Sequence, residues 1–233
     1  EDSFTKKIYN NTNGMVSSEA NSICGTEDGY IWLGSYAGLT RYDGKEFEFI
    51  REGGLVNVVC MMNDSSGRLW IGTNDAGIAR YENGRYTYFT MEDGLPSNTV
   101  KCFAEDENGN VYVGTSDKIC MFHKDDRIEV MGQGITFAKV MTVYQDKLLV
   151  LDNNGTMYAI DDNNTIALSG YLGKDLFFYS LCNTSKGLLV GTETGELFWA
   201  DVTEREIILC SQVVMTANQI SALYEDSAGR IWV

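Results

Sequence analysis

The chain has 233 residues and a formal net charge of −15, from 33 acidic and 18 basic residues. Such a charge repels a nucleic-acid backbone and an anionic lipid surface over most of the protein, so nucleic acid is not an expected partner. The length, with 44% hydrophobic residues and 24 glycines, predicts one turn-rich all-β domain over residues 1–233. No run of eighteen apolar residues occurs, so the sequence predicts no membrane-spanning helix.

Strands separated by tight turns are predicted along the whole chain. The first is residues 4–9, FTKKIY, expected to be the outer strand of a sheet whose other strands lie elsewhere. Complete repeats follow, each with an inner strand, an LWIGT-like strand, a GIARY-like strand and an outer strand. In the second repeat these strands are predicted at residues 58–63, 69–73, 78–81 and 86–89. Asn-Gly and Asp-Gly pairs between the apolar runs indicate antiparallel hairpins.

This repeat occurs six times, which predicts the architecture. The aligned positions lie 37 to 43 residues apart and are Trp32, Trp70, Tyr112, Leu149, Leu189 and Trp232. A period of about 40 residues with several Gly-punctuated strands per unit is typical of propeller blades. We therefore predict a β-propeller of about six four-stranded antiparallel blades. Five would be complete, and the sixth, which lacks its third strand, would be shared between the two ends of the chain.

The second copy of the repeat follows the pattern D-x-x-G-x-Φ-W-Φ-G-T-x-x-G-Φ-x-R-Y-x-x-G-x-F, where Φ is apolar. Its matching residues are Asp64, Gly67, Trp70, Gly72, Thr73, Gly77, Arg80, Tyr81, Gly84 and Tyr86. The pattern resembles the two-component regulator propeller repeat. The first copy has Ser35 for the Thr, and the fourth has Leu151 and Asp152 where Gly-Thr is expected.

The resemblance implies the extracytoplasmic sensor part, periplasmic or cell-surface, of a bacterial membrane-bound signalling protein. It also implies a histidine kinase or another output, such as a diguanylate cyclase, in the parent protein. The ligand that it implies is a carbohydrate, with dimerisation as the other possible role of the propeller. An unpaired edge at the last predicted strand, Ile231 to Val233, would also favour a homodimer.

The repeated residues are expected to serve the fold. Recurrence of Trp at one strand position favours packing between blades over sugar stacking. The remaining structural positions are Gly34, Gly72, Gly114, Gly191, Arg41 and Arg80. Each arginine is expected to lay its stem between blades and to pair with a carboxylate. The turn residues Asp64, Asp106 and Asp226 are expected to accept backbone N–H bonds.

No catalytic motif is recognisable in the sequence. His123 is the single histidine, and G-x-S-x-G and H-E-x-x-H are absent, so we expect no enzymatic activity, no metal site and no cofactor. An extracellular glycan-processing propeller enzyme remains one alternative, and a protein-interaction scaffold is another. The six cysteines are read as small buried side chains, because a core of this size does not need disulfides.

Ligand residues are sought where the repeats differ. Loops joining second to third strands, and loops joining consecutive blades, lie at the same end of antiparallel sheets. The candidates there are Tyr36, Asn74, Asp75, Asn98, Asp117, Phe137, Phe177 and Phe178. Such a mixture of rings, amides and carboxylates suits an oligosaccharide.

Overall fold

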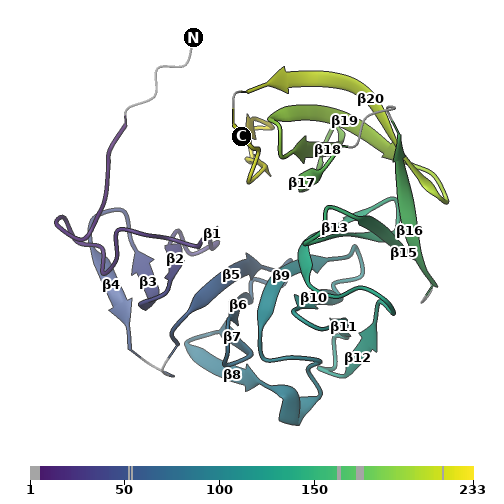
Figure 1. The fold of residues 1–233 in the computed structure, drawn as a ribbon. Coiled ribbons are helices and arrows are strands. Elements are labelled where there is room, and N and C mark those ends of the chain that lie inside the picture. The colour runs from purple at the N-terminus through teal and green to yellow at the C-terminus, as the bar shows by residue number, and fades with distance from the viewer. Residues whose placement is uncertain (1–5, 52, 54, 162–163, 172–175, 217) are drawn as a thin grey trace. The chain divides into compact units, whose positions relative to one another are not determined.

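The structure is a computed structural model that describes residues 6–51, 53, 55–161, 164–171, 176–216 and 218–233. It separates into two compact units. The N-terminal unit is Glu1–Gly94 with Asn98–Val100, and the C-terminal unit is Leu95–Ser97 with Lys101–Val233. Figure 1 shows that the described chain consists of antiparallel sheets in succession along the sequence. Within the described residues, no helix has the length and apolar character required to cross a membrane.

The first two sheets belong to the N-terminal unit. Sheet 1 contains β1 (Ser22–Gly25), β2 (Ile31–Ser35), β3 (Gly38–Tyr42) and β4 (Phe47–Ile50). Sheet 2 contains β5 (Val58–Asn63), β6 (Leu69–Thr73), β7 (Ile78–Glu82) and β8 (Arg85–Phe89). The four strands predicted for the second repeat are therefore confirmed, with one residue added to the third and to the fourth. The short 3-10 helix η2 (Met91–Asp93) follows β8.

Three further four-stranded meanders follow. Sheet 3 contains β9 (Val100–Glu105), β10 (Val111–Thr115), β11 (Ile119–Phe122) and β12 (Ile128–Met131). Sheet 4 contains β13 (Ala138–Tyr144), β14 (Lys147–Asp152), β15 (Met157–Asp161) and β16 (Asn164–Tyr171). Sheet 5 contains β17 (Phe178–Thr184), β18 (Gly187–Thr192), β19 (Glu196–Val202) and β20 (Glu206–Met215). The final pair is β21 (Tyr224–Glu225) and β22 (Ile231–Trp232).

The outer strands of sheets 4 and 5 pair with each other, which the repeat did not predict. Strands β16 and β20 run parallel, with Ser169 opposite Glu206. This pairing joins the two meanders into one eight-stranded sheet. It covers part of the edge that each outer strand would otherwise expose.

The predicted N-terminal strand is wrong for its described part. Residues 4 and 5 lie outside the described residues, and residues 6–9 form no strand. Instead, the Tyr9 hydroxyl lies 2.7 Å from the Tyr42 hydroxyl, and its ring lies edge-on to Phe47 at 5.2 Å. The segment is thus held by aromatic contacts on sheet 1, while β21 and β22 pair with each other among the described strands.

The motif glycines mark places where neighbouring sheets approach closely. A Cβ on Gly72 would lie 2.5 Å from Cys60 Sγ and 2.7 Å from Val100 Cγ1. The other three repeat this arrangement: Gly34 faces Val58, Gly114 faces Cys102 and Ala138, and Gly191 faces Ser180 and Ile220. At Gly34, Gly72 and Gly114 the glycine therefore lets the first strand of the next sheet pack against the backbone of the second strand, whereas Ile220, which meets Gly191, precedes β21. Leu151 occupies this position in sheet 4 and is fully buried in a core cluster.

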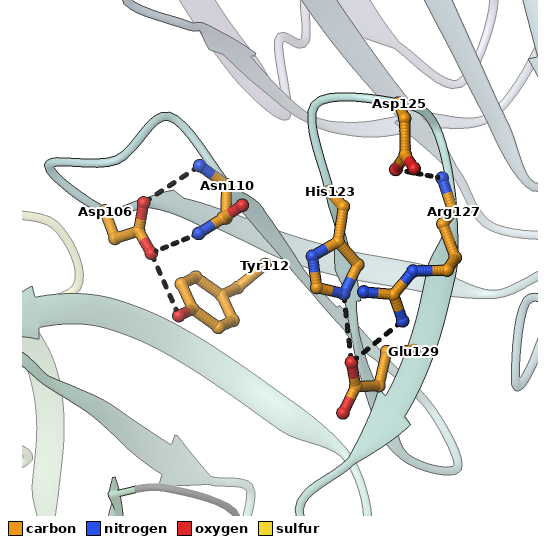
Figure 2. Close-up of polar contacts among 7 residues, drawn as sticks. All are labelled: Asp106, Asn110, Tyr112, His123, Asp125, Arg127 and Glu129. Atoms are coloured by element: carbon orange, nitrogen blue, oxygen red, sulfur yellow. Dashed lines mark hydrogen bonds and ion pairs between the residues drawn. The ribbon is translucent and has the colours of Figure 1, made fainter.

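Aspartates in the turns between the first and second strands lie at the end of each sheet opposite the motif glycines, and they accept backbone N–H bonds as predicted. Asp64 Oδ1 accepts hydrogen bonds from the Ser66 and Arg68 amides, and Asp64 Oδ2 accepts one from Trp70 Nε1 at 2.7 Å. Asp106 and Asp226 repeat this arrangement, with Tyr112 and Trp232 as the aromatic donors. Figure 2 shows the Asp106 case, in which Asn110 also donates its side-chain amide. Spacing from Asp to the aromatic at i+6 is the sequence signal for this arrangement.

Two of the three motif tryptophans are core residues. Trp32 and Trp70 are each 1% exposed, and Trp32 contacts Tyr81 of sheet 2 with ring centroids 5.3 Å apart. Packing between sheets is therefore confirmed for Trp32. Trp232 is 45% exposed, which corrects the expectation that it is core, because its strand pairs with β21 alone among the described strands.

The arginines of the motif lie over aromatic rings. Arg41 pairs with Glu48 at 2.6 Å, as expected, and its guanidinium lies 4.2 Å from the Tyr30 ring centroid. Arg80 is buried, and its guanidinium lies 5.3 Å from the Trp70 ring centroid. These cation–π contacts fix the rings from one side.

All six cysteines are free thiols. Cys102 and Cys120 are buried as expected, and burial raises the pKa of each thiol to about 12. Cys210 on β20 is exposed, which corrects the prediction of a buried side chain at that position. Its strand is the outer strand of sheet 5, where one face is left to solvent.

Candidate ligand-binding site

We call the end of each sheet that carries the turn between its second and third strands the loop end. In the N-terminal unit, hydrogen bonds connect the loops at this end. The Asn57 amide donates to the Tyr36 carbonyl, and the Asn74 amide donates to the Asn57 carbonyl, at 3.1 and 3.0 Å. Asn57 Nδ2 reaches Asp75 Oδ2 at 3.3 Å. The structure therefore brings the predicted residues Tyr36, Asn74 and Asp75 together.

Asn98 belongs to the same network but holds the backbone. Its Oδ1 accepts from the Met91 amide at 2.8 Å, and its carbonyl accepts from the Gly77 amide. Thr99 Oγ1 donates to the Asn74 carbonyl at 2.6 Å. The side chain of Asn98 thus shapes the loop, while Tyr36 is 63% exposed and presents its ring to solvent.

The loop end of the C-terminal unit carries aromatic rings and two lysines. Lys101 on β9 places its Nζ 5.0 Å from the centroid of the Phe137 ring. Lys139 on β13 places its Nζ 2.8 Å from the centroid of the Tyr179 ring. All four side chains are half-buried. Phe137 has a φ of 61°, so the backbone just before β13 is held in a conformation that is rare for a bulky residue.

β-Bulges aim two of these side chains. The registers of the β13–β14 and β17–β18 pairs shift between Ala138 and Val140 and between Phe178 and Ser180. Lys139 and Tyr179 are therefore the extra residues of two bulges, and a bulge redirects the side chain that it carries. The repeat gives Lys101 the corresponding position, one residue before the Cys102 that faces a motif glycine.

The predicted pair Phe177 and Phe178 is divided between surface and core. Phe177 is 36% exposed, and its ring lies over Gly155 in the β14–β15 turn, where a Cβ would come within 2.9 Å. Phe178 is 4% exposed and packs in a core cluster with Leu151. Phe178 is thus unavailable to a ligand, because the first residue of the inner strand points towards the neighbouring sheet. Asp117 lies in the β10–β11 turn, where its amide donates to Thr115 Oγ1.

Sequence reasoning missed Lys101, Lys139 and Tyr179. These three residues occupy the same repeat position, directly after the buried first residue of the inner strand. Sheet 2 has Val59 at this position, so the residue type varies between repeats. Variation at one repeat position was the available signal. The resulting arrangement combines flat apolar rings with ammonium groups at the end of rigid strands, and it can stack on a ring-shaped ligand while donating hydrogen bonds.

The single histidine forms a separate cluster, which Figure 2 shows beside the Asp106 turn. His123 Nε2 lies 2.9 Å from Glu129 Oε2, and Arg127 reaches the same oxygen at 3.2 Å. The hydrogen bond with His123, and then the one from Arg127, lower the pKa of Glu129. This cluster links the end of β11 to β12.

A hollow of about 600 Å³ lies at the other end of sheets 1 and 2. It is lined by turn residues and by strand ends, and three of its lining residues are acidic: Glu27, Asp28 and Glu82. Asp28 accepts a hydrogen bond from Thr26 Oγ1 within its own turn. This hollow shares none of the predicted ligand residues.

Comparison with known proteins agrees with the repeat pattern. Residues 53–75, 94–117 and 215–233 match the family described as two component regulator propeller. No curated protein sequence matches the chain. Among solved structures, the extracellular domain assigned to the hybrid two component system BT4673 from B. thetaiotaomicron is 20% identical, with a TM-score of 0.69. That match covers 91% of this chain and 30% of the other, so this chain spans about a third of its length.

Two other solved structures share the fold at lower identity. Virginiamycin B lyase from Staphylococcus aureus is 14% identical with a TM-score of 0.72, over 91% of this chain and 75% of the lyase. The WD40 beta propeller domain of Doa1 is 14% identical with a TM-score of 0.70, over 91% of this chain and 74% of that domain. These likenesses establish a β-propeller fold. The three matched segments are similar to the two component regulator propeller family.

Proposed function

We propose that this chain is the extracytoplasmic ligand-sensing propeller of a membrane-bound two-component signalling protein, and that it recognises a carbohydrate. The family repeats and the likeness to an extracellular domain of such a system support the sensor role. The carbohydrate assignment is supported by one structural observation above the others. Aromatic rings lie at the loop ends of successive sheets in the C-terminal unit: Phe137 beside Lys101, Tyr179 beside Lys139, and Phe177 over Gly155.

A non-catalytic role fits the way in which the turn carboxylates are used. Asp106, Asp152 and Asp226 each accept two backbone N–H bonds and one bond from an aromatic side chain. A carboxylate committed to such a turn is poorly placed to act as a general acid or base. The lyase that shares the fold makes an enzyme the second candidate, and assay of the purified chain against glycan substrates would distinguish the two. Dimerisation as part of signalling also belongs to this proposal.

Calorimetric titration of the purified chain with a panel of defined oligosaccharides tests the carbohydrate assignment. We expect saturable binding of one class of oligosaccharide. Phe177→Leu should weaken that binding about fivefold or more, because stacking of a sugar on an aromatic ring contributes on the order of 1 kcal/mol. Tyr88→Leu is the matched control, since Tyr88 is a comparably exposed ring (42%) on the outer strand β8. Equal effects of the two variants, or binding of no saccharide, would contradict the assignment.

A further inference from the structure

We infer that two copies of this chain associate through β20, by antiparallel pairing of its open outer edge about a two-fold axis. The inference rests on the dimerisation included in the proposed function and deepens it by naming the contact. It is carried by the length, the exposure and the lack of charge of this strand. It places the contact on β20 instead of the edge expected at Ile231 to Val233, because β22 has only two residues.

The outer edge of β20 is open over most of its length. In the part of the chain that the structure describes, β20 pairs with β19 along one edge and with β16 along the other. The pairing with β16 reaches only Ile208, so no described strand pairs with that edge from Leu209 to Met215. We call this segment the free edge. Its outward backbone N–H and C=O groups can pair with a strand of another molecule.

The free edge lacks the side chains that protect the other outer strands. Strands β4, β8 and β12 have four or five residues, and each includes a charged residue: Glu48, Arg85 and Glu129. Strand β20 has ten residues, and after Glu206 it contains no charged residue and no proline. Charged residues and prolines are common means by which an edge strand avoids pairing with another chain. By these criteria β20 is the outer strand best suited to accept a partner.

Side chains along this strand are accessible. Ile208 and Val213 are each 45% exposed, and Cys210, Ser211 and Gln212 between them are exposed as well. The register of the β19–β20 pair shifts twice, so Cys210 and Val213 are the extra residues of two bulges. Bulges bend a strand and interrupt its ladder. We therefore expect a short, weak contact between two chains.

Charge favours a second copy of this chain as the occupant. With a formal net charge of −15, two copies repel each other over most of their surfaces. Residues 207–224 contain no charged side chain, so a like-charged copy meets the least repulsion there. A cationic partner would instead be drawn to the acidic surface elsewhere. An identical edge also offers matching donors and acceptors, and two-fold pairing satisfies both copies at once.

Sedimentation velocity of the whole chain over about 1–200 µM tests the association, a range suited to a contact smaller than the ~1,200 Å² of stable interfaces. Hydrogen exchange measured by mass spectrometry at both ends of this range locates the contact. We expect a monomer–dimer equilibrium, with slower exchange of the free-edge amides at the higher concentration and no such change in β12. Raising NaCl from about 0.05 M to 0.5 M should strengthen the dimer, since salt screens the repulsion between two acidic chains.

Val213→Lys tests the free edge, and Val130→Lys is the matched control. Val130 is 50% exposed on the outer strand β12, so both variants make the same change in net charge at an exposed valine. Val213→Lys should weaken the dimer about tenfold or more, because two-fold pairing would bring two lysines together. Val130→Lys should not weaken it. A melting curve shows whether each variant is folded, and the hydrogen-exchange result on the wild type is independent of both.

The outcomes separate the inference from the function on which it rests. A dimer without concentration-dependent protection of the free edge, or one weakened equally by both variants, would overturn the inference and leave dimerisation standing. Species that keep growing beyond the dimer, or a dimer that weakens as salt is raised, would also overturn it. A monomer at every concentration would overturn both the inference and dimerisation, and leave carbohydrate sensing to its own titration. Protection of the free edge that is lost in Val213→Lys alone would support the inference.

Discussion

The buried Trp70–Asp64 hydrogen bond provides a direct test of how the repeat stabilises the fold. Trp70 is 1% exposed, and its Nε1 donates at 2.7 Å to Asp64 Oδ2, whose side chain is fully buried. Trp70→Ala removes the ring and leaves a cavity, which should lower the free energy of unfolding by about 3–5 kcal/mol. Trp70→Phe keeps a ring but removes the donor. Loss of a hydrogen bond to a buried charged group should lower that free energy by about 1.5–3 kcal/mol.

Trp232→Phe is the matched control for the donor. Trp232 Nε1 makes the same bond to Asp226 Oδ2 at 2.9 Å, but its ring is 45% exposed. Water can replace the indole as a donor there, so the free energy of unfolding should change by about 0.5 kcal/mol or less. Trp70→Phe and Trp232→Phe therefore remove the same hydrogen bond and differ in its burial.

Urea unfolding followed by far-ultraviolet circular dichroism is the appropriate assay, because tryptophan fluorescence changes with the substitutions themselves. The midpoint and the slope together give the free energy of unfolding for each variant. An equal loss in Trp70→Phe and Trp232→Phe would refute the reasoning that burial determines the contribution of this bond. A loss below about 1 kcal/mol in Trp70→Ala would also refute the reasoning, since removing a buried ring of that size leaves a cavity that should destabilise the fold by more than this.

Three further outcomes are expected. Gly72→Ala should lower the free energy of unfolding in urea by about 1–2 kcal/mol, since overpacking outweighs the gain from a stiffer unfolded chain. Gly25→Ala is the control and should not destabilise the fold, because a Cβ at Gly25 meets nothing within 4 Å; a larger loss in Gly25→Ala than in Gly72→Ala would contradict the packing account. Cys210 should react with a thiol reagent in the native protein at about pH 8, whereas Cys102, with a pKa of about 12, should react only on unfolding. Mass spectrometry of the labelled peptides identifies the sites, and equal labelling of the two cysteines would contradict the burial of Cys102. The pKa of Glu129 is lowered by its hydrogen bond with His123, so the stability that this bond contributes is present above the unfolded pKa and is lost as the pH falls through the folded pKa. The difference in melting temperature between wild type and Glu129→Gln should therefore shrink between about pH 6 and pH 3. A difference that stays constant over this range would contradict the prediction.

Strand positions, turns and the repeat could be derived from the sequence because their causes are local. Alternation of side chains with a period of two and the positive φ angles of Asn-Gly and Asp-Gly turns involve neighbouring residues only. These rules predicted all four strands of sheet 2 to within one residue. They also predicted that Asp64 would accept the backbone N–H bonds of its turn.

The tertiary structure decided which faces are covered and how side chains are aimed. Phe177 and Phe178 are adjacent in sequence, yet the ring of one covers Gly155 at the loop end while the other is in the core. The two bulges that present Lys139 and Tyr179, and the parallel pairing of β16 with β20, depend on contacts between strands far apart in the chain. The sequence determined the repeat because turns and alternation are short-range; the candidate site depended on register and packing between sheets, which no single repeat contains.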